Sequence, residues 1–142
     1  MAKLAVADVD AVLFQTTLCV QVGDVNYGGH LANDAVLRLC HEVRMRWLAG
    51  LGWSETDAGG AGLIMADAAV QYLAQGFYGD ELSAEMGVED IGKGGFALLF
   101  RLTRITNGKV LARARTGMMC FDYVRQKVCR LPEALKTVLE VV

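Results

Sequence analysis

Apolar and polar positions follow two different periods in the first third of the chain. Between about Ala11 and Gly23 apolar residues alternate with polar ones, and many residues are β-branched, which predicts a half-buried strand. From about Asn33 to Ala49 the period lengthens to about 3.6 residues, which predicts an amphipathic helix that ends at the following glycines. The apolar stripe of this helix consists of Val36, Leu39, Cys40, Val43 and Trp47.

After the helix, apolar residues again alternate with polar ones, almost to the end of the chain. Turn residues divide it into segments, and Asn107-Gly108 is the strongest hairpin signal among them. Pro132 suits the first turn of a short helix that follows it. The predicted elements are strands over residues 63–75, 81–91, 96–102 and about 109–123, and a helix from Glu133 to Leu139.

The order of these elements predicts one α+β domain that spans residues 1–142. One long helix is expected to cover one face of a five-stranded antiparallel sheet, with the strands after the helix in a meander and a short helix at the C-terminus. A single helix leaves part of that face and the sheet edges open. Pairing of two chains would cover the exposed parts.

Composition narrows the class of protein further. Of the 142 residues 54% are apolar, and the mean hydropathy is +0.32, which favours either a membrane span or an extensive subunit interface. No run of about 18 apolar residues exists, so a membrane span is excluded. The net charge of −2 comes without a basic block, which argues against a nucleic-acid partner. We therefore expect a homodimer or homotetramer.

The N-terminus and the cysteines bear on location and on metal binding. Residues 1–8 lack the sustained apolar core of a signal peptide, so a cytoplasmic protein is expected. The four cysteines form no Cys-x-x-Cys pair and have no histidine at zinc spacing. They are interpreted as ordinary buried or half-buried thiols, and neither a metal nor a cofactor is expected.

Polar chemistry is concentrated in residues 23–34, between the first strand and the long helix. This stretch holds two carboxylates, two carboxamides, three glycines and one of the two histidines. A loop that leads into a helix N-terminus presents free backbone N–H groups, which can stabilise a developing oxyanion. Gly28 and Gly29 would let a ligand approach the backbone closely, while Asp24, Asp34 or His30 could act as general base.

Structural interpretations compete with these functional ones. Asp34 could complement the helix dipole and pair with the arginine four residues on. Asn33 is a better N-cap by chemistry than its neighbour Ala32, and Asp24 could bond its own loop backbone. His41, on the charged side of the helix, is interpreted as a surface or interface residue.

The stretch resembles the signature of hotdog-fold acyl-CoA thioesterases of the 4-hydroxybenzoyl-CoA thioesterase type, which reads loosely D-x-D-x-x-G-H-V-N-N. The resemblance implies a central helix wrapped by the sheet, a dimer with a continuous sheet, often a tetramer, and a thioester held between subunits. It also implies that the helix N-terminus polarises the thioester carbonyl while a carboxylate attacks it or activates water, without a metal. The matching positions are Asp24, Gly29, His30 and Asn33, then Glu42, Arg44 and Trp47 in the helix, and Leu131-Pro132-Glu133.

Two positions depart from this signature. The second acid, commonly the catalytic carboxylate of the family, is Asn26 here, and the first asparagine of the pair is Ala32. Because an amide cannot act as a base at neutral pH, catalysis would need Asp24, Asp34 or a water assisted by His30. The substitution also leaves open an acyl-CoA-binding module without activity.

A second resemblance is to hotdog-fold enoyl-CoA hydratases, whose signature is G-D-x-N-P-x-H. This chain has Gly23-Asp24-Val25-Asn26 but lacks the proline and carries one extra residue before the histidine. We rank this activity second to acyl-CoA hydrolysis.

For acyl-CoA hydrolysis, the candidate catalytic residues are Asp24, Asn26, His30 and Asp34, and the candidate substrate-binding residues are Tyr27, Gly28, Gly29, Leu31 and Asn33. In this hypothesis the amides around Gly29 to Asn33 bind the carbonyl, and Asp24 and His30 organise the attacking water.

Overall fold

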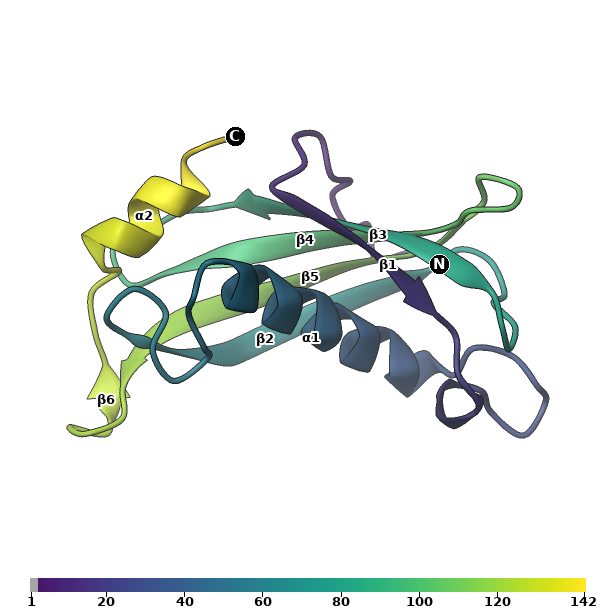
Figure 1. Cartoon of the computed structure of the whole chain (residues 1–142), viewed down its shortest axis with the longest axis horizontal. Coiled ribbons are helices and arrows are strands. Elements are labelled where there is room, and N and C mark those ends of the chain that lie inside the picture. Colours follow the sequence, from purple (N-terminus) through teal and green to yellow (C-terminus); the bar gives the residue numbers. More distant parts are fainter. Residues whose placement is uncertain (1–2) are drawn as a thin grey trace.

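The structure is a computed structural model that describes residues 3–142. In chain order its elements are β1 (Phe14–Cys19), a 3-10 turn η1 (Val22–Asp24), α1 (Asn33–Gly50), β2 (Gly62–Tyr72), β3 (Glu81–Glu89), β4 (Gly95–Arg104), β5 (Val110–Asp122), β6 (Lys127–Val128) and α2 (Glu133–Leu139). Figure 1 shows α1 lying across one face of a single curved sheet.

The sheet is antiparallel throughout, with the strand order β1-β3-β4-β5-β2 and with β6 paired to β5. The predicted α+β class and the long helix on an antiparallel sheet are confirmed. The predicted meander is wrong for β2, which pairs with β5 instead of β3. Because α1 crosses the face of the sheet before β2 begins, the chain returns at the far edge. The two-residue β6 makes a sixth strand.

Most element boundaries agree with the prediction. The long helix begins at Asn33 and ends at Gly50, one residue beyond the predicted end, and α2 has the predicted bounds. The first strand is shorter than predicted, because the chain turns into η1 after residue 21. In β2 a bulge between Met65 and Asp67 interrupts the predicted alternation.

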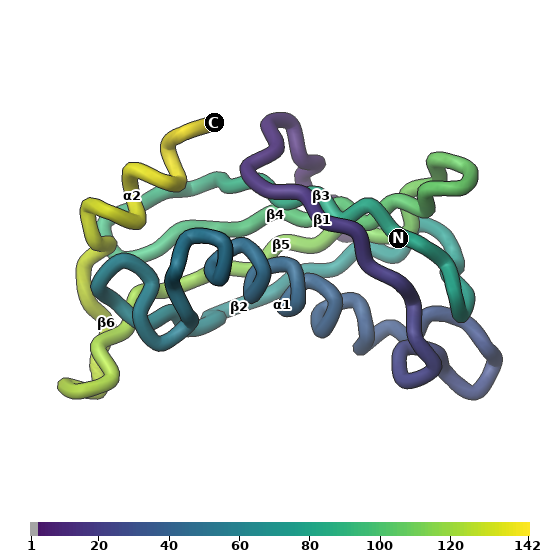
Figure 2. The backbone as a smooth tube through the Cα atoms, viewed as in Figure 1, coloured from purple at the N-terminus to yellow at the C-terminus, as the bar shows by residue number. Residues whose placement is uncertain are grey.

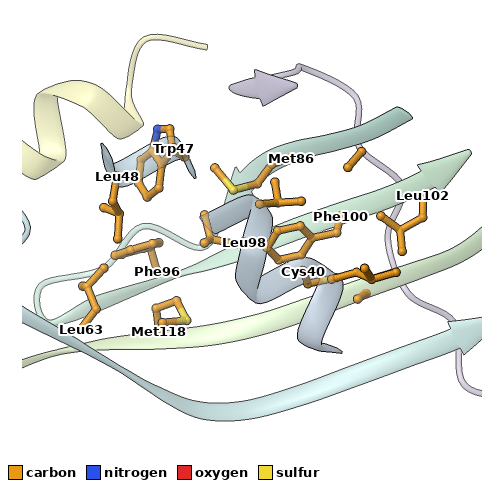
Figure 3. Packing of buried hydrophobic residues seen from close by; sticks show 14 of the residues in the cluster. Cys40, Trp47, Leu48, Leu63, Met86, Phe96, Leu98, Phe100, Leu102 and Met118 are labelled. Atoms are coloured by element: carbon orange, nitrogen blue, oxygen red, sulfur yellow. The ribbon is translucent and has the colours of Figure 1, made fainter. Parts of the chain in front are cut away.

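The hydrophobic core lies between α1 and the concave face of the sheet. Cys40 and Trp47 of the helix stripe are buried against side chains of β3, β4 and β5 (Figure 3). Phe100 of β4 is fully buried and lies under the middle of the helix. This packing fixes the axis of α1 over the sheet and so fixes where its N-terminus lies.

The segment before β1 covers part of the opposite face of the sheet. Val9 is buried, and a side chain at Gly87 in β3 would lie 3.1 Å from it. Asp8 accepts a hydrogen bond from Arg101 at 2.9 Å and lies 3.4 Å from Arg113. Burial alone would raise the pKa of Asp8, but a bond from the Val9 amide and the two guanidinium groups outweigh it and lower that pKa.

The two sheet edges differ in how they are covered. Arg46 of α1 donates to Thr16 Oγ1 and Thr17 O, both at 2.9 Å, and so crosses over β1. On the other edge β2 pairs only with β5, and Met65 and Tyr72 are 47% and 52% exposed. Within residues 3–142 no helix is long and apolar enough to cross a membrane, and no group of three potential metal ligands occurs.

Candidate active site

Two loops meet at the start of α1. The loop between β1 and α1 and the loop between β2 and β3 lie side by side at this end of the molecule (Figure 2). The Leu31 N–H donates to Gly76 O at 2.7 Å, and the rings of His30 and Phe77 lie edge to face with centroids 5.3 Å apart. These contacts hold the polar stretch in one conformation beside the helix N-terminus.

Most backbone amides of the predicted carbonyl-binding stretch already have acceptors. Among the amides from Gly29 to Asn33, these bonds leave only the Asn33 N–H without an acceptor in the described residues. The bonds are Gly29 N–H to Asn26 O at 2.9 Å, His30 N–H to Asn26 Oδ1 at 3.1 Å, Leu31 N–H to Gly76 O at 2.7 Å, and Ala32 N–H to Asp24 O at 2.8 Å.

The helix itself begins without a side-chain cap. Ala32 is the N-cap residue, with φ −72° and ψ 147°, and no side chain bonds to the first turn. The prediction that Asn33 caps the helix is wrong, because Asn33 is the first helical residue. Within residues 3–142 the N–H groups of Asn33 and Asp34 have no acceptor. They form the positive end of the helix dipole and remain available to a ligand.

A hollow of about 330 Å³ opens beside this helix start. Its polar side chains are Asn26, His30, Asn33, Tyr72 and Gln75, and no carboxylate, lysine or arginine lines it. Apolar side chains complete the walls, among them Leu31, Val36, Leu73 and Leu111. The arrangement offers neutral donors and acceptors and one imidazole around an apolar interior, beside the helix start at Asn33.

The structure places the two predicted acids outside this hollow. Asp24 accepts a hydrogen bond from the Gln21 N–H at 2.9 Å and so closes the 3-10 turn. It lines a second hollow of about 300 Å³ on the other side of the loop. Asp34 lies 3.0 Å from Arg38, and its side chain is 78% exposed. Both acids therefore occupy the positions that the structural interpretations predict.

Three of the predicted substrate-binding residues lie at the loop tip. Tyr27 is fully exposed, and it does not line the hollow. Gly29 has φ +82°, a left-handed conformation that favours glycine, and its N–H closes a tight turn with Asn26. A Cβ added at Gly28 would lie 3.5 Å from the side chains of Asn26 and His30, which is ordinary van der Waals contact. Of the predicted site residues, the structure brings together Asn26, His30, Leu31 and Asn33.

The end of β2 and the β2–β3 loop also contribute to the site, and the sequence pattern did not indicate this. The Tyr72 hydroxyl donates to Asn33 O at 3.0 Å, and Gln75 lines the hollow. Phe77 lies between His30 and the guanidinium of Arg104, which is 5.7 Å from the ring centroid. One available signal was Gly76, where a side chain would lie 3.0 Å from Leu111 and 3.1 Å from Leu31.

Comparisons with known proteins identify the family of the chain. The family model described as thioesterase-like superfamily matches residues 20–139. A 1,4-dihydroxy-2-naphthoyl-CoA hydrolase of Synechococcus elongatus is 26% identical over 132 residues, which cover 90% of this chain and 96% of the relative.

Solved structures are similar over nearly the whole chain. A 1,4-dihydroxy-2-naphthoyl-CoA thioesterase from Synechocystis superposes with a TM-score of 0.81 at 22% identity, covering 91% of this chain and 96% of that one. A gentisyl-coenzyme A thioesterase superposes with a TM-score of 0.77 at 16% identity, covering 89% and 99%. This likeness confirms the predicted hotdog fold.

Proposed function

The chain belongs to the thioesterase-like superfamily and is a thioester hydrolase, and from that premise we propose that it hydrolyses aromatic acyl-CoA thioesters to the free acid and CoA. The observation that carries the proposal is the uncapped start of α1, where the N–H groups of Asn33 and Asp34 have no acceptor in the described residues and Asn33 lines the hollow. Such donors stabilise the oxyanion that forms when a thioester carbonyl is attacked.

The two remaining polar groups of the loop orient the attacking water in this proposal. The Asn26 carboxamide oxygen, Oδ1, accepts a hydrogen bond from the backbone N–H of His30. The NH₂ group of Asn26 and the imidazole of His30 therefore remain at the hollow. Neither group carries a negative charge, so neither repels the developing oxyanion. Asp24 is not part of this mechanism, because its carboxylate bonds to the Gln21 N–H.

The walls of the hollow favour an aromatic acyl group with hydroxyl substituents. Leucine and valine side chains suit the ring, and the amides of Asn26, Asn33 and Gln75 can pair with hydroxyl groups. The relatives named for 1,4-dihydroxy-2-naphthoyl-CoA act on a substrate of this class.

We also propose that the chain acts as a homodimer through β2. A long edge strand with exposed apolar side chains is a ready template for pairing with another strand, and Met65 and Tyr72 lie on this edge. In a two-fold dimer the same strand of both subunits would pair and extend the sheet.

Release of free thiol from a panel of acyl-CoA thioesters tests the activity. The panel contains 1,4-dihydroxy-2-naphthoyl-, 4-hydroxybenzoyl-, benzoyl- and straight-chain acyl-CoA. We expect kcat/KM for the hydroxylated aromatic thioesters to exceed that for the aliphatic ones by about tenfold or more, because the site's amides pair only with the hydroxyl groups. Folded protein that releases no thiol from any of them would contradict the proposal.

A trans-2-enoyl-CoA in the same panel separates hydrolysis from hydration. Loss of enoyl absorbance without thiol release would identify a hydratase instead.

The dimer is tested by Ala68→Lys, which places two like charges near each other across the paired β2 strands. We expect this variant to sediment as a monomer where the wild type sediments as a dimer.

A further inference from the structure

Arg104, the last residue of β4, contacts the loop between β2 and β3 but does not line the hollow. Its Nε donates to Asp80 Oδ2 at 2.9 Å, and another nitrogen of the same guanidinium donates to Gln75 O. The Arg104 side chain is 13% exposed and that of Asp80 is 20% exposed. Because salt screens such a sheltered pair only weakly, the ion pair firmly ties the end of β4 to this loop.

Asp80, the partner in this ion pair, also organises the loop. The carboxylate oxygen that accepts from Arg104 accepts the Phe77 N–H as well, at 2.9 Å. In the backbone, the Asp80 N–H donates to Phe77 O at 3.0 Å, and Asp80 O accepts the Val20 N–H at 2.9 Å. Arg104 and Asp80 together therefore fix the backbone on both sides of Gly76.

Gly76 is the point at which the loop contacts the start of α1. Its carbonyl oxygen accepts the Leu31 N–H at 2.7 Å. The approach is close, since a side chain at Gly76 would lie 3.1 Å from Leu31. Gln75, the residue before Gly76, lines the hollow. The bond from Arg104 to Gln75 O therefore holds the residue whose side-chain amide faces the hollow.

The Phe77 ring makes a second connection to the site. Cζ of Arg104 lies 5.7 Å from the centroid of this ring, within the range of a cation–π interaction. The same ring meets the imidazole of His30 with centroids 5.3 Å apart and an interplanar angle of 62°. A contiguous set of contacts thus runs from Arg104, outside the hollow, to His30 in its wall.

We propose that Arg104 is a positioning residue that determines the substrate preference of this site, because it holds the β2–β3 loop against the start of α1 and so keeps Gln75 at the acyl group. This inference rests on the proposed hydrolysis of hydroxylated aromatic thioesters. The Gln75 amide pairs with a hydroxyl group of the acyl ring and has no partner on an unsubstituted ring. A guanidinium is suited to the task, since its planar fork bonds Asp80 and Gln75 O at the same time.

Arg104→Ala is the first test, with 4-hydroxybenzoyl-CoA and benzoyl-CoA as a substrate pair that differs by one hydroxyl group. We expect KM for 4-hydroxybenzoyl-CoA to rise about tenfold, as for a lost hydrogen bond, while KM for benzoyl-CoA changes less than about twofold. The same ratio of the two KM values as in the wild type, measured on folded protein, would overturn the proposal.

A second variant guards against unfolding, because Arg104→Ala leaves the sheltered carboxylate of Asp80 without its cation. Arg104→Met combined with Asp80→Asn removes both charges together and keeps an acceptor for the Phe77 N–H. We expect the same loss of preference from this double variant. If it folds and keeps the wild-type KM ratio, the proposal fails.

Arg101→Met is the matched control. Arg101 lies three residues earlier on β4 and pairs with Glu85 and Asp8, both at 2.9 Å, away from the hollow. Its loss should lower Tm, but the KM ratio should stay that of the wild type. An equal loss of preference in Arg101→Met would show that any weakened ion pair of β4 has this effect, and would overturn the specific role of Arg104.

Hydrogen exchange of the Leu31 N–H tests the positioning without any substrate. This amide belongs to the β1–α1 loop, but its acceptor is Gly76 O in the loop that Arg104 holds. In Arg104→Ala we expect its exchange to accelerate about tenfold or more, while amides in the middle of α1 keep their protection. Unchanged exchange at Leu31 would overturn the proposal.

Failure of this inference and failure of the proposed function give different results. If the wild type hydrolyses neither thioester, or both equally well, the proposed function fails, and exchange at Leu31 still decides whether Arg104 holds the loop. If the wild type prefers the hydroxylated thioester and Arg104→Ala keeps that preference, only the role of Arg104 fails.

Discussion

The loop before α1 separates two hollows of similar size, one lined by uncharged side chains and the other by charged ones. The hollow beside the helix start, about 330 Å³, has no ionised carboxylate, lysine or arginine in its walls. The second, about 300 Å³, is lined by Asp24, Arg38, Glu42 and Arg46. In the second hollow Arg46 bonds to Glu42 at 2.7 Å, and Arg38 bonds to Gly23 O at 3.3 Å.

This difference shows that the number of charged groups is a poor guide to reactivity here. The charges of the second hollow are satisfied by neighbours within the chain. The hollow beside the helix start has no formally charged side chain in its walls, but the backbone N–H of Asn33, which lines it, has no acceptor in the described part of the chain. Unfilled donors at a helix N-terminus are the groups that can stabilise a charge arriving with a ligand.

The largest effect is expected from Asn33→Pro, which removes one free donor of the helix start. Proline is tolerated at the first helical position, and Ala32 already has the extended conformation that precedes proline. We expect kcat to fall about 10²–10³-fold, as for loss of an oxyanion donor, with little change in Tm. Asn33→Ala keeps the N–H and serves as control. Equal kcat values for the two variants would show that this donor does not bind the carbonyl.

The next largest effect is expected at Asn26. Asn26→Ala removes the acceptor of the His30 N–H, so the loop loses a contact that orders it, and we expect kcat/KM to fall about tenfold, equivalent to a lost hydrogen bond. Asn26→Asp keeps the acceptor but brings a negative charge into the neutral hollow. Its activity should not exceed that of the wild type. A clear gain in kcat for Asn26→Asp would mean that the site uses a carboxylate at this position.

A smaller effect, on stability and not on activity, is expected from a change at Asp24, which lines the second hollow. Asp24→Ala leaves the Gln21 N–H without its side-chain acceptor. We expect a loss of about 1 kcal/mol in the free energy of unfolding, measured in urea, and less than about threefold change in kcat. A collapse of kcat with unchanged stability would instead support the catalytic role first predicted for Asp24.

The smallest effect is expected from Asp34→Asn. The carboxylate is exposed and pairs only with Arg38, four residues along the helix. Such pairs contribute about 0.3–0.5 kcal/mol, and salt screens them. The backbone N–H of residue 34 is retained, so kcat should stay within about twofold of the wild type. A tenfold loss of kcat in this variant would give the carboxylate itself a role in the site.

The sequence identified the elements whose signals are local. The helix from Asn33 was predicted because its period and the glycines after it occur within one stretch, and Pro132 marked the start of α2 for the same reason. The loop residues of the hollow, Asn26 and His30, were found because polar residues cluster there.

What the sequence did not reveal depends on contacts between distant segments. The pairing of β2 with β5 follows from the path of α1 over the sheet, and no residue in β2 encodes it alone. Tyr72 and Gln75 join the hollow only because that path brings the end of β2 to the helix start. The cap at Ala32 was mispredicted since the Ala32 N–H is held by Asp24 O, which sets where the helix begins.

The segment before β1 has a consequence for the order of folding. Asp8 and Val9 contact Arg101, which lies more than 90 positions later in the chain. Contacts of such sequence separation form after the sheet that supports them. The segment should therefore dock last and open first in the native state, exposing the amides of residues 6–9 to hydrogen exchange while those of α1 remain protected.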